Sequence, residues 1–109
     1  MDKITKKEFI TALTENNSIF FGMTKQLACR DEIEIYLDDF DNDNRIVEER
    51  SAKAHSNCLE FSGGSRLYFD QKGGYSFHKM VYGKHSVYVC MEYANTENPK
   101  CMYYMVNVA

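Results

Sequence analysis

The chain has 109 residues, of which 44% are hydrophobic and 14% aromatic, so it is long enough for one domain with a modest core and too apolar to be disordered. Its 13 basic and 16 acidic residues give a net charge of −3, which disfavours a strongly basic nucleic-acid-binding protein. Apolar runs are only a few residues long, whereas a membrane-spanning helix needs about 20 such residues. The basic start is not followed by the apolar segment of a secretory leader, and we therefore expect a cytoplasmic protein with no membrane association.

The first predicted element is a helix that begins after Thr5. Thr5 and Glu8 fit a capping box, in which each side chain bonds the free backbone N–H of the other residue. Ile4 before the cap and Phe9 in the first turns fit a hydrophobic staple, which fixes the direction in which the chain enters the helix. After the helix, we expect residues 18–22 to form a short buried connector.

A second helix is expected to start between Thr24 and Asp31 and to end near Phe40. Its apolar side chains recur at helical spacing and gather on one face, and acidic side chains line both flanks of that face. Nine acidic residues and a single basic one lie between residues 31 and 49. Ile35 falls between the acidic flanks, opposite the expected core face, so this helix presents an acidic surface with one apolar side chain at its centre.

From residue 45 onward the pattern changes to that of strands. We expect a first strand at residues 45–51, although residues 52–54 also allow a helical turn. Further alternating segments predict strands at residues 75–82, 87–93 and 102–108. Glycine pairs between these segments mark the turns.

Residues 62–65 predict a β-hairpin, because they are rich in glycine and serine and separate two apolar segments. A two-residue turn would mix apolar and polar side chains on each face of this hairpin. A three-residue loop at residues 63–65 instead places Phe61 opposite Leu67 and keeps the faces distinct. We therefore expect the three-residue loop. It directs Leu59, Phe61, Leu67 and Phe69 towards the helices and Glu60 and Tyr68 away from them.

Together these elements predict an α+β fold, in which two N-terminal helices pack on a C-terminal antiparallel β-meander of four to five strands. We expect one domain over residues 1–109. Its helical part is residues 1–44, and its sheet is residues 45–109.

No set of residues in the sequence predicts an enzyme, a metal site or a cofactor. Three aspartates at residues 39, 41 and 43 occupy the first positions of a calcium-binding loop, but Asn44 and Arg50 stand where that loop needs Gly and Glu. A zinc site needs two pairs of ligands, and His55 with Cys58 is a pair without a second one of comparable spacing.

Cysteine chemistry is also disfavoured. Cys58 with His55 and Cys90 with His78 are the conceivable nucleophile–base pairs, but neither has an identifiable third group to orient the histidine. Because the chain is expected in the cytoplasm, we interpret its four cysteines as reduced residues that pack in the core.

Three stretches of the sequence resemble small uncharacterised proteins encoded by phages and mobile elements of Gram-positive bacteria. They are Glu8-Phe9-Ile10 followed by Glu15-Asn16-Asn17-Ser18, then Phe20-Phe21-Gly22, and finally Asn57-Cys58-Leu59 leading into Gly64-Ser65-Arg66-Leu67-Tyr68-Phe69. The resembled proteins have no assigned activity, so no functional residue carries over. The resemblance implies a bacterial host and a context in which short proteins bind and inhibit host proteins, including CRISPR and other defence effectors.

These observations lead to two candidate functions from different classes. The first is a non-enzymatic protein-binding module, an inhibitor whose acidic helix contacts a host protein with a basic surface. Its expected contact residues are Asp31, Glu34, Ile35, Asp38, Asp39 and Asp41. The alternative is a small nucleic-acid-binding protein that stacks bases on an aromatic sheet face beside basic side chains. Its expected contact residues are Arg66, Tyr68, Lys79 and Tyr88.

Overall fold

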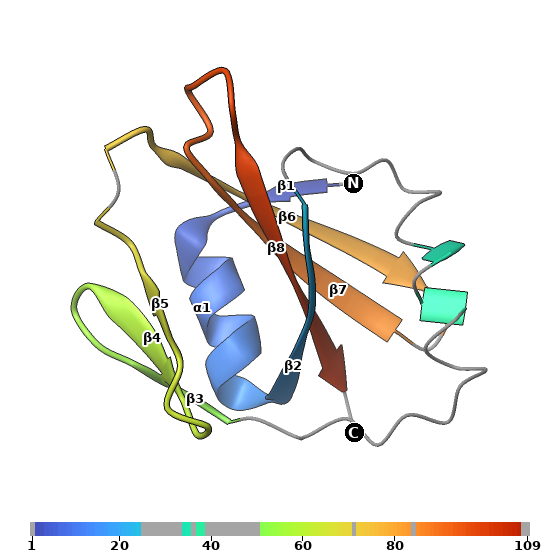
Figure 1. The fold of residues 1–109 in the computed structure, drawn as a ribbon. Coiled ribbons are helices and arrows are strands. Elements are labelled where there is room, and N and C mark those ends of the chain that lie inside the picture. The colour runs from blue at the N-terminus through green and yellow to red at the C-terminus, as the bar shows by residue number, and fades with distance from the viewer. Residues whose placement is uncertain are drawn as a thin grey trace.

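The structure is a computed structural model, and it describes residues 2–24, 34–35, 37–38, 51–70, 72–83 and 85–107. This part of the chain forms an α+β fold with one helix, α1 (Lys6–Glu15), and two antiparallel sheets (Figure 1). The larger sheet contains, in spatial order, β1 (Asp2–Ile4), β6 (Tyr75–Tyr82), β7 (His85–Glu92), β8 (Lys100–Asn107) and β2 (Asn17–Thr24). The smaller sheet contains β3 (Ala52–Ala54), β4 (Cys58–Phe61) and β5 (Arg66–Tyr68).

Helix α1 confirms the prediction for the start of the chain. The Glu8 backbone N–H donates to the Thr5 hydroxyl over 3.1 Å, which is the N-cap bond expected from the sequence. Phe9 and Leu13 are buried against the sheets, and Ile4 packs at the edge of the same cluster. At the other end, the Asn16 side-chain amide donates to the Ala12 carbonyl over 2.9 Å and satisfies one of the last free carbonyls of the helix.

The five-stranded sheet is buried on both faces, because alternate residues of its central strands β7 and β8 enter two different apolar clusters. The first cluster, which we call the Leu37 cluster, consists of Leu37, Met80, Val87, Val89, Cys101, Tyr103 and Met105. The second, which we call the Phe9 cluster, consists of Phe9, Leu13, Leu59, Phe61, Leu67, Phe77, Cys90, Tyr104 and Val106. One face of the large sheet is therefore covered by α1 and the small sheet (Figure 1), and the other receives Leu37.

Aromatic rings connect the three structural elements that meet in the Phe9 cluster, which are α1, the large sheet and the small sheet. Phe9 of α1 lies 5.0 Å from Phe77 of β6 and 5.9 Å from Tyr104 of β8, measured between ring centroids. Phe61 of β4 stacks on the same Tyr104 ring at 5.5 Å, with the two planes 5° apart. Tyr104 thus contacts both the helix and the small sheet.

The hairpin of the small sheet has the predicted faces but a different register. Leu59 pairs with Leu67 and Glu60 with Arg66, and the Phe61 N–H donates to the Ser65 carbonyl over 2.9 Å. The loop has three residues, as predicted, but they are residues 62–64. The prediction that Phe61 lies opposite Leu67 was therefore wrong by two positions. A shift of two leaves every side chain on its face, and Leu59, Phe61 and Leu67 are buried as expected.

Several other expectations are corrected. Within the described residues, α1 is the one helix whose bounds the structure gives, where two helices were predicted, and the strands form two sheets rather than one meander. Residues 2–4 and 17–24 are edge strands of the large sheet, so the division into a helical part and a sheet part was wrong, and the predicted connector at residues 18–22 is a strand. Residues 52–54 form β3 and not a helical turn.

The second predicted helix and the strand predicted at residues 45–51 lie largely outside the described residues. Glu34, Ile35, Leu37 and Asp38 have helical backbone, and the rest of the second predicted helix is not described. Residues 45–50 of the strand predicted before β3 are likewise not described. No helix in the described part of the chain is long and apolar enough to cross a membrane.

The paired glycines before β6, Gly73 and Gly74, are required by packing. The Asn95 N–H donates to the Gly73 carbonyl over 2.8 Å, and the Ala94 N–H donates to the Gly74 carbonyl over 3.1 Å. This holds the turn before β6 against the turn after β7. A β-carbon on Gly73 would lie 2.9 Å from the Tyr93 Cα, so only glycine allows the two backbones to approach this closely.

The stacked pair of Phe61 and Tyr104 predicts an energetic coupling between the two sheets. In a double-mutant cycle with Phe61→Leu and Tyr104→Leu, we expect the two losses in the free energy of unfolding to differ from additivity by about 0.5–1.5 kcal/mol. Chemical denaturation of the four proteins measures this difference. The control cycle pairs Phe61→Leu with Met105→Leu, because Met105 belongs to the Leu37 cluster on the other face. Additivity in both cycles would contradict the coupling.

Candidate functional sites

The acidic segment around Ile35 is fixed to the large sheet through two neighbouring contacts. The Leu37 side chain is fully buried, with 0% of its surface exposed, among residues of β6, β7 and β8. Next to it, the Tyr82 hydroxyl lies 3.0 Å and 3.2 Å from the two carboxylate oxygens of Asp38 and donates its proton to this group. These contacts hold the helical backbone here, and Ile35 is left 60% exposed.

Three of the six residues predicted for partner binding are therefore described, and they belong to this one segment. Ile35 is exposed, as expected from the sequence, and Asp38, three residues later, is also exposed, while Glu34 is half-buried. We call Glu34, Ile35 and Asp38 the Ile35 surface. The other three predicted residues, Asp31, Asp39 and Asp41, lie outside the described part of the chain.

The four residues predicted for nucleic-acid binding do not share one surface. Arg66 and Tyr68 lie on β5, where they alternate with the buried Leu67 and so face away from α1. Lys79 and Tyr88 are paired across β6 and β7, on the face of the large sheet that α1 covers. The alternation of β5 and the packing of α1 thus separate the two pairs.

The Lys79 and Tyr88 pair lies at the side of α1. The Lys79 ammonium is 5.5 Å from the centre of the Tyr88 ring, a cation–π arrangement. Both residues border a shallow groove of about 430 Å³ whose other wall is α1. The charges along this groove are mixed, since Lys7 faces it together with Glu8 and Glu15, so the groove does not favour a ligand of either sign.

The aromatic sheet face expected as a stacking platform does not form as one surface. Tyr103 is fully buried in the Leu37 cluster, and Tyr82 packs against that cluster while its hydroxyl bonds Asp38. Tyr75 stacks on Phe77, and its hydroxyl donates to the Tyr68 carbonyl over 3.0 Å. Most of these tyrosines serve packing, because a sheet that is covered on both sides buries aromatic side chains from both faces.

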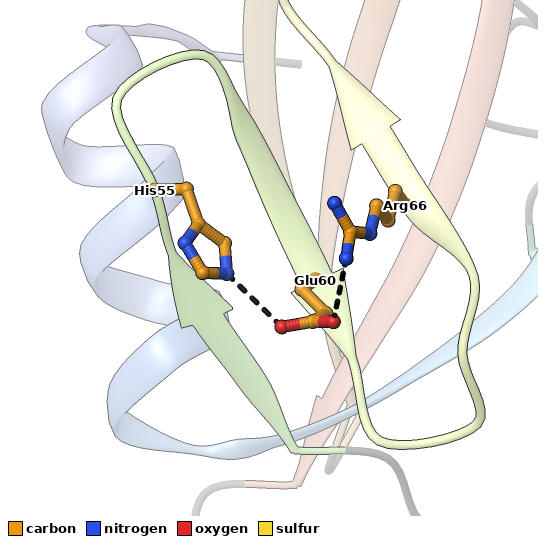
Figure 2. A network of polar contacts seen from close by, with 3 residues as sticks. All are labelled: His55, Glu60 and Arg66. Atoms are coloured by element: carbon orange, nitrogen blue, oxygen red, sulfur yellow. Dashed lines mark hydrogen bonds and ion pairs between the residues drawn. The ribbon is translucent and has the colours of Figure 1, made fainter.

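The outer face of the small sheet carries a charged network that the sequence analysis did not predict. Glu60 on β4 lies between two basic groups, with His55 Nε2 3.0 Å from one carboxylate oxygen and Arg66 Nη2 3.0 Å from the other (Figure 2). Lys53 pairs directly with Glu60 across β3 and β4. We call Lys53, His55, Glu60, Arg66 and Tyr68 the outer face. Cross-strand pairing brings these residues together, and that pairing depends on the register that the sequence did not fix.

These contacts shift the ionisation of the network. The hydrogen bond from His55, followed by the charge of Arg66, lowers the pKa of Glu60 below its ordinary value of 4.5. The hydrogen bond with Tyr68 and the charge of Glu60 raise the pKa of Arg66. Glu60 and Arg66 are therefore ionised at neutral pH, and the Glu60 carboxylate is shared between two neighbours.

The described cysteines are core residues, as the sequence analysis expected. Cys58, Cys90 and Cys101 are buried, and burial raises the pKa of Cys90 and raises that of Cys101 to about 11. Such thiols are poor nucleophiles at neutral pH. Within the described ranges, no three His, Cys, Asp or Glu side chains gather closely enough to hold a metal ion. Cys29 and the aspartates of the calcium-loop pattern lie outside those ranges.

Leu37 and Ile35 should differ sharply in their effect on stability. Leu37→Ala leaves a cavity against the sheet and should lower the free energy of unfolding by about 2–5 kcal/mol. Ile35→Ala removes a mostly exposed side chain and should change it by less than about 0.5 kcal/mol. Urea denaturation of the two variants measures both values. Equal losses in the two variants would contradict the opposite orientations of these side chains.

The network on the outer face predicts a measurable change in the ionisation of Glu60. Because its pKa is lowered in the folded chain, the stabilisation from this network is present above pH 4.5 and is lost as the pH falls through the folded pKa. NMR titration of the Glu60 carboxyl carbon should show a higher pKa in His55→Ala and in Arg66→Gln. If neither substitution raises this pKa, the network of Figure 2 is not formed in solution.

Protein-family models, curated proteins and solved structures give no match to this chain. No known site is therefore available to be transferred to it residue by residue. Two surfaces remain from which its function can be inferred, namely the Ile35 surface and the outer face.

Proposed function

We propose that this chain is a non-enzymatic protein-binding module whose contact surface is centred on Ile35. The observation that carries the proposal is the contrast between neighbouring apolar side chains: Leu37 is fully buried, whereas Ile35 is 60% exposed. Ile35 and Leu37 both have helical backbone and are two positions apart, so the anchoring of Leu37 restricts the direction in which Ile35 points. An exposed aliphatic side chain held in place among acidic groups is suited to a protein partner.

The energetics of association support this use of the Ile35 surface. Contacts that form in the free protein, here the burial of Leu37 and the bond between Tyr82 and Asp38, reduce the conformational entropy lost on binding. A central apolar side chain that becomes desolvated supplies most of the affinity, and the polar rim around it supplies much less. Glu34 and Asp38 would form such a rim and would favour encounter with a basic partner.

We infer the biological setting from the resemblance to phage and mobile-element proteins. In that setting the partner is a host protein with a basic surface, and binding inhibits it. CRISPR and other defence effectors are host proteins of this kind, because they bind nucleic acid through basic surfaces. The acidic surface would then occupy a site that normally takes a nucleic-acid backbone.

The proposal is tested with a partner that the wild-type chain captures from a nuclease-treated lysate of a Gram-positive host. That partner is purified, and its affinity for variants is measured by titration. Ile35→Ala should weaken binding by more than about fivefold, the equivalent of about 1 kcal/mol. Glu34→Gln should slow association and reduce its dependence on salt, since exposed charges act mainly on the rate of encounter.

Tyr68→Ala is the matched control, because it also removes an exposed apolar side chain but from the outer face of the small sheet. It should leave the affinity of this partner unchanged. Asp38→Asn, which keeps an oxygen that can accept the bond from Tyr82, separates the charge of Asp38 from its structural contact. A partner that binds Ile35→Ala and Glu34→Gln as tightly as wild type would disprove the role of the Ile35 surface.

A further inference from the structure

The outer face of the small sheet is a locally basic surface on an acidic protein. The chain as a whole has a net charge of −3, but on this face His55 and Arg66 contact the carboxylate of Glu60. Lys53 is the cross-strand neighbour of Glu60. Arg66 and Lys53 are both paired with Glu60 across the strands, one on each side. One carboxylate cannot neutralise both, so the face favours an anionic ligand.

An exposed aromatic ring lies on the same face. Tyr68 is two residues after Arg66 on β5, so the pleat of the strand directs both side chains to the same side. The Tyr68 side chain is 42% exposed, and its backbone carbonyl accepts the Tyr75 hydroxyl bond, which fixes this end of the strand. A ring held in this way beside a guanidinium offers a stacking surface for a planar group.

A shallow hollow of about 260 Å³ borders the charged network. Its lining includes Glu60 and Lys53 as well as Ser51 and Ser62. The hollow thus combines an ammonium group with two hydroxyls next to a carboxylate that already has two partners. These groups suit a phosphate, which accepts hydrogen bonds from all of the donors and can replace the Glu60 carboxylate beside Arg66.

From these features we propose that the outer face binds single-stranded nucleic acid. Proteins that bind single strands without sequence preference combine cationic groups that follow the phosphates with aromatic rings that stack on bases. Lys53 and Arg66 supply the cationic groups and Tyr68 supplies the ring, while Glu60 holds Arg66 in place and competes with the phosphate. An acidic peptide would use the charges but would not stack on the exposed ring of Tyr68, so the nucleic acid is the better match. This surface is distinct from the Ile35 surface.

The test is fluorescence anisotropy with labelled single-stranded DNA and RNA of about ten nucleotides, a length within the usual range for such sites. Wild type should bind in a saturable manner, and affinity should fall as salt is raised. Tyr68→Ala should weaken binding at least about fivefold through the lost stacking, and Arg66→Gln should weaken it and reduce the salt dependence. Glu60→Gln should strengthen binding, because it removes the competing carboxylate.

Lys79→Gln is the matched control for Arg66→Gln, since Lys79 is also a basic residue beside a tyrosine but lies on the other sheet. It should bind as wild type does. The proposal is overturned if wild type shows no saturable binding to either oligonucleotide at low salt, or if Tyr68→Ala and Arg66→Gln bind as tightly as wild type. It is also overturned if a poly-glutamate peptide binds the same face with the same loss in Tyr68→Ala, since an acidic protein would then be the better ligand.

Discussion

The rest of the structure depends on the requirement that the five-stranded sheet be covered on both faces. Alternate residues of β7 and β8 are apolar on each side, with Val87 and Val89 facing one cluster and Cys90 facing the other. Burial of apolar surface is the main favourable contribution to folding, so each face needs its own cover. Helix α1 and the small sheet cover the face that bears Cys90. Leu37 packs against the face that bears Val87 and Val89, and this contact fixes the segment that bears Ile35.

Features that depend on local sequence could be predicted. The capping of α1 by Thr5, the strands at residues 75–82 and the faces of the hairpin all follow from nearby residues or from a period of two. The register of the hairpin could not, because a shift of two positions preserves the same faces. The edge strands β1 and β2 could not be predicted either, because they are formed by pairing with β6 and β8, far along the chain, and strand formation depends strongly on such partners.

The two candidate surfaces also differ in whether they could be predicted from local sequence. The exposure of Ile35 follows from helical spacing, and the structure confirms it. The network of His55, Glu60 and Arg66 depends on which residues face each other across the small sheet, which no local pattern reveals. The prediction that the tyrosines form an aromatic stacking surface failed for a related reason. A sheet covered by α1 alone would have left the tyrosines of its other face exposed. The burial of Tyr103 and the packing of Tyr82 in the Leu37 cluster show that this other face is also used for packing.

The most direct test of this account is whether Leu37 packs on the face of the large sheet that lies opposite α1. Methyl-labelled protein allows nuclear Overhauser effects to be measured between the methyl groups of Leu37 and those of Val87 and Val89, which share its cluster. The account predicts strong effects from Leu37 to both valines and none from Ile35 to either. Effects from Ile35 in place of Leu37, or from neither residue, would contradict the two-sided burial and with it the orientation of the Ile35 surface.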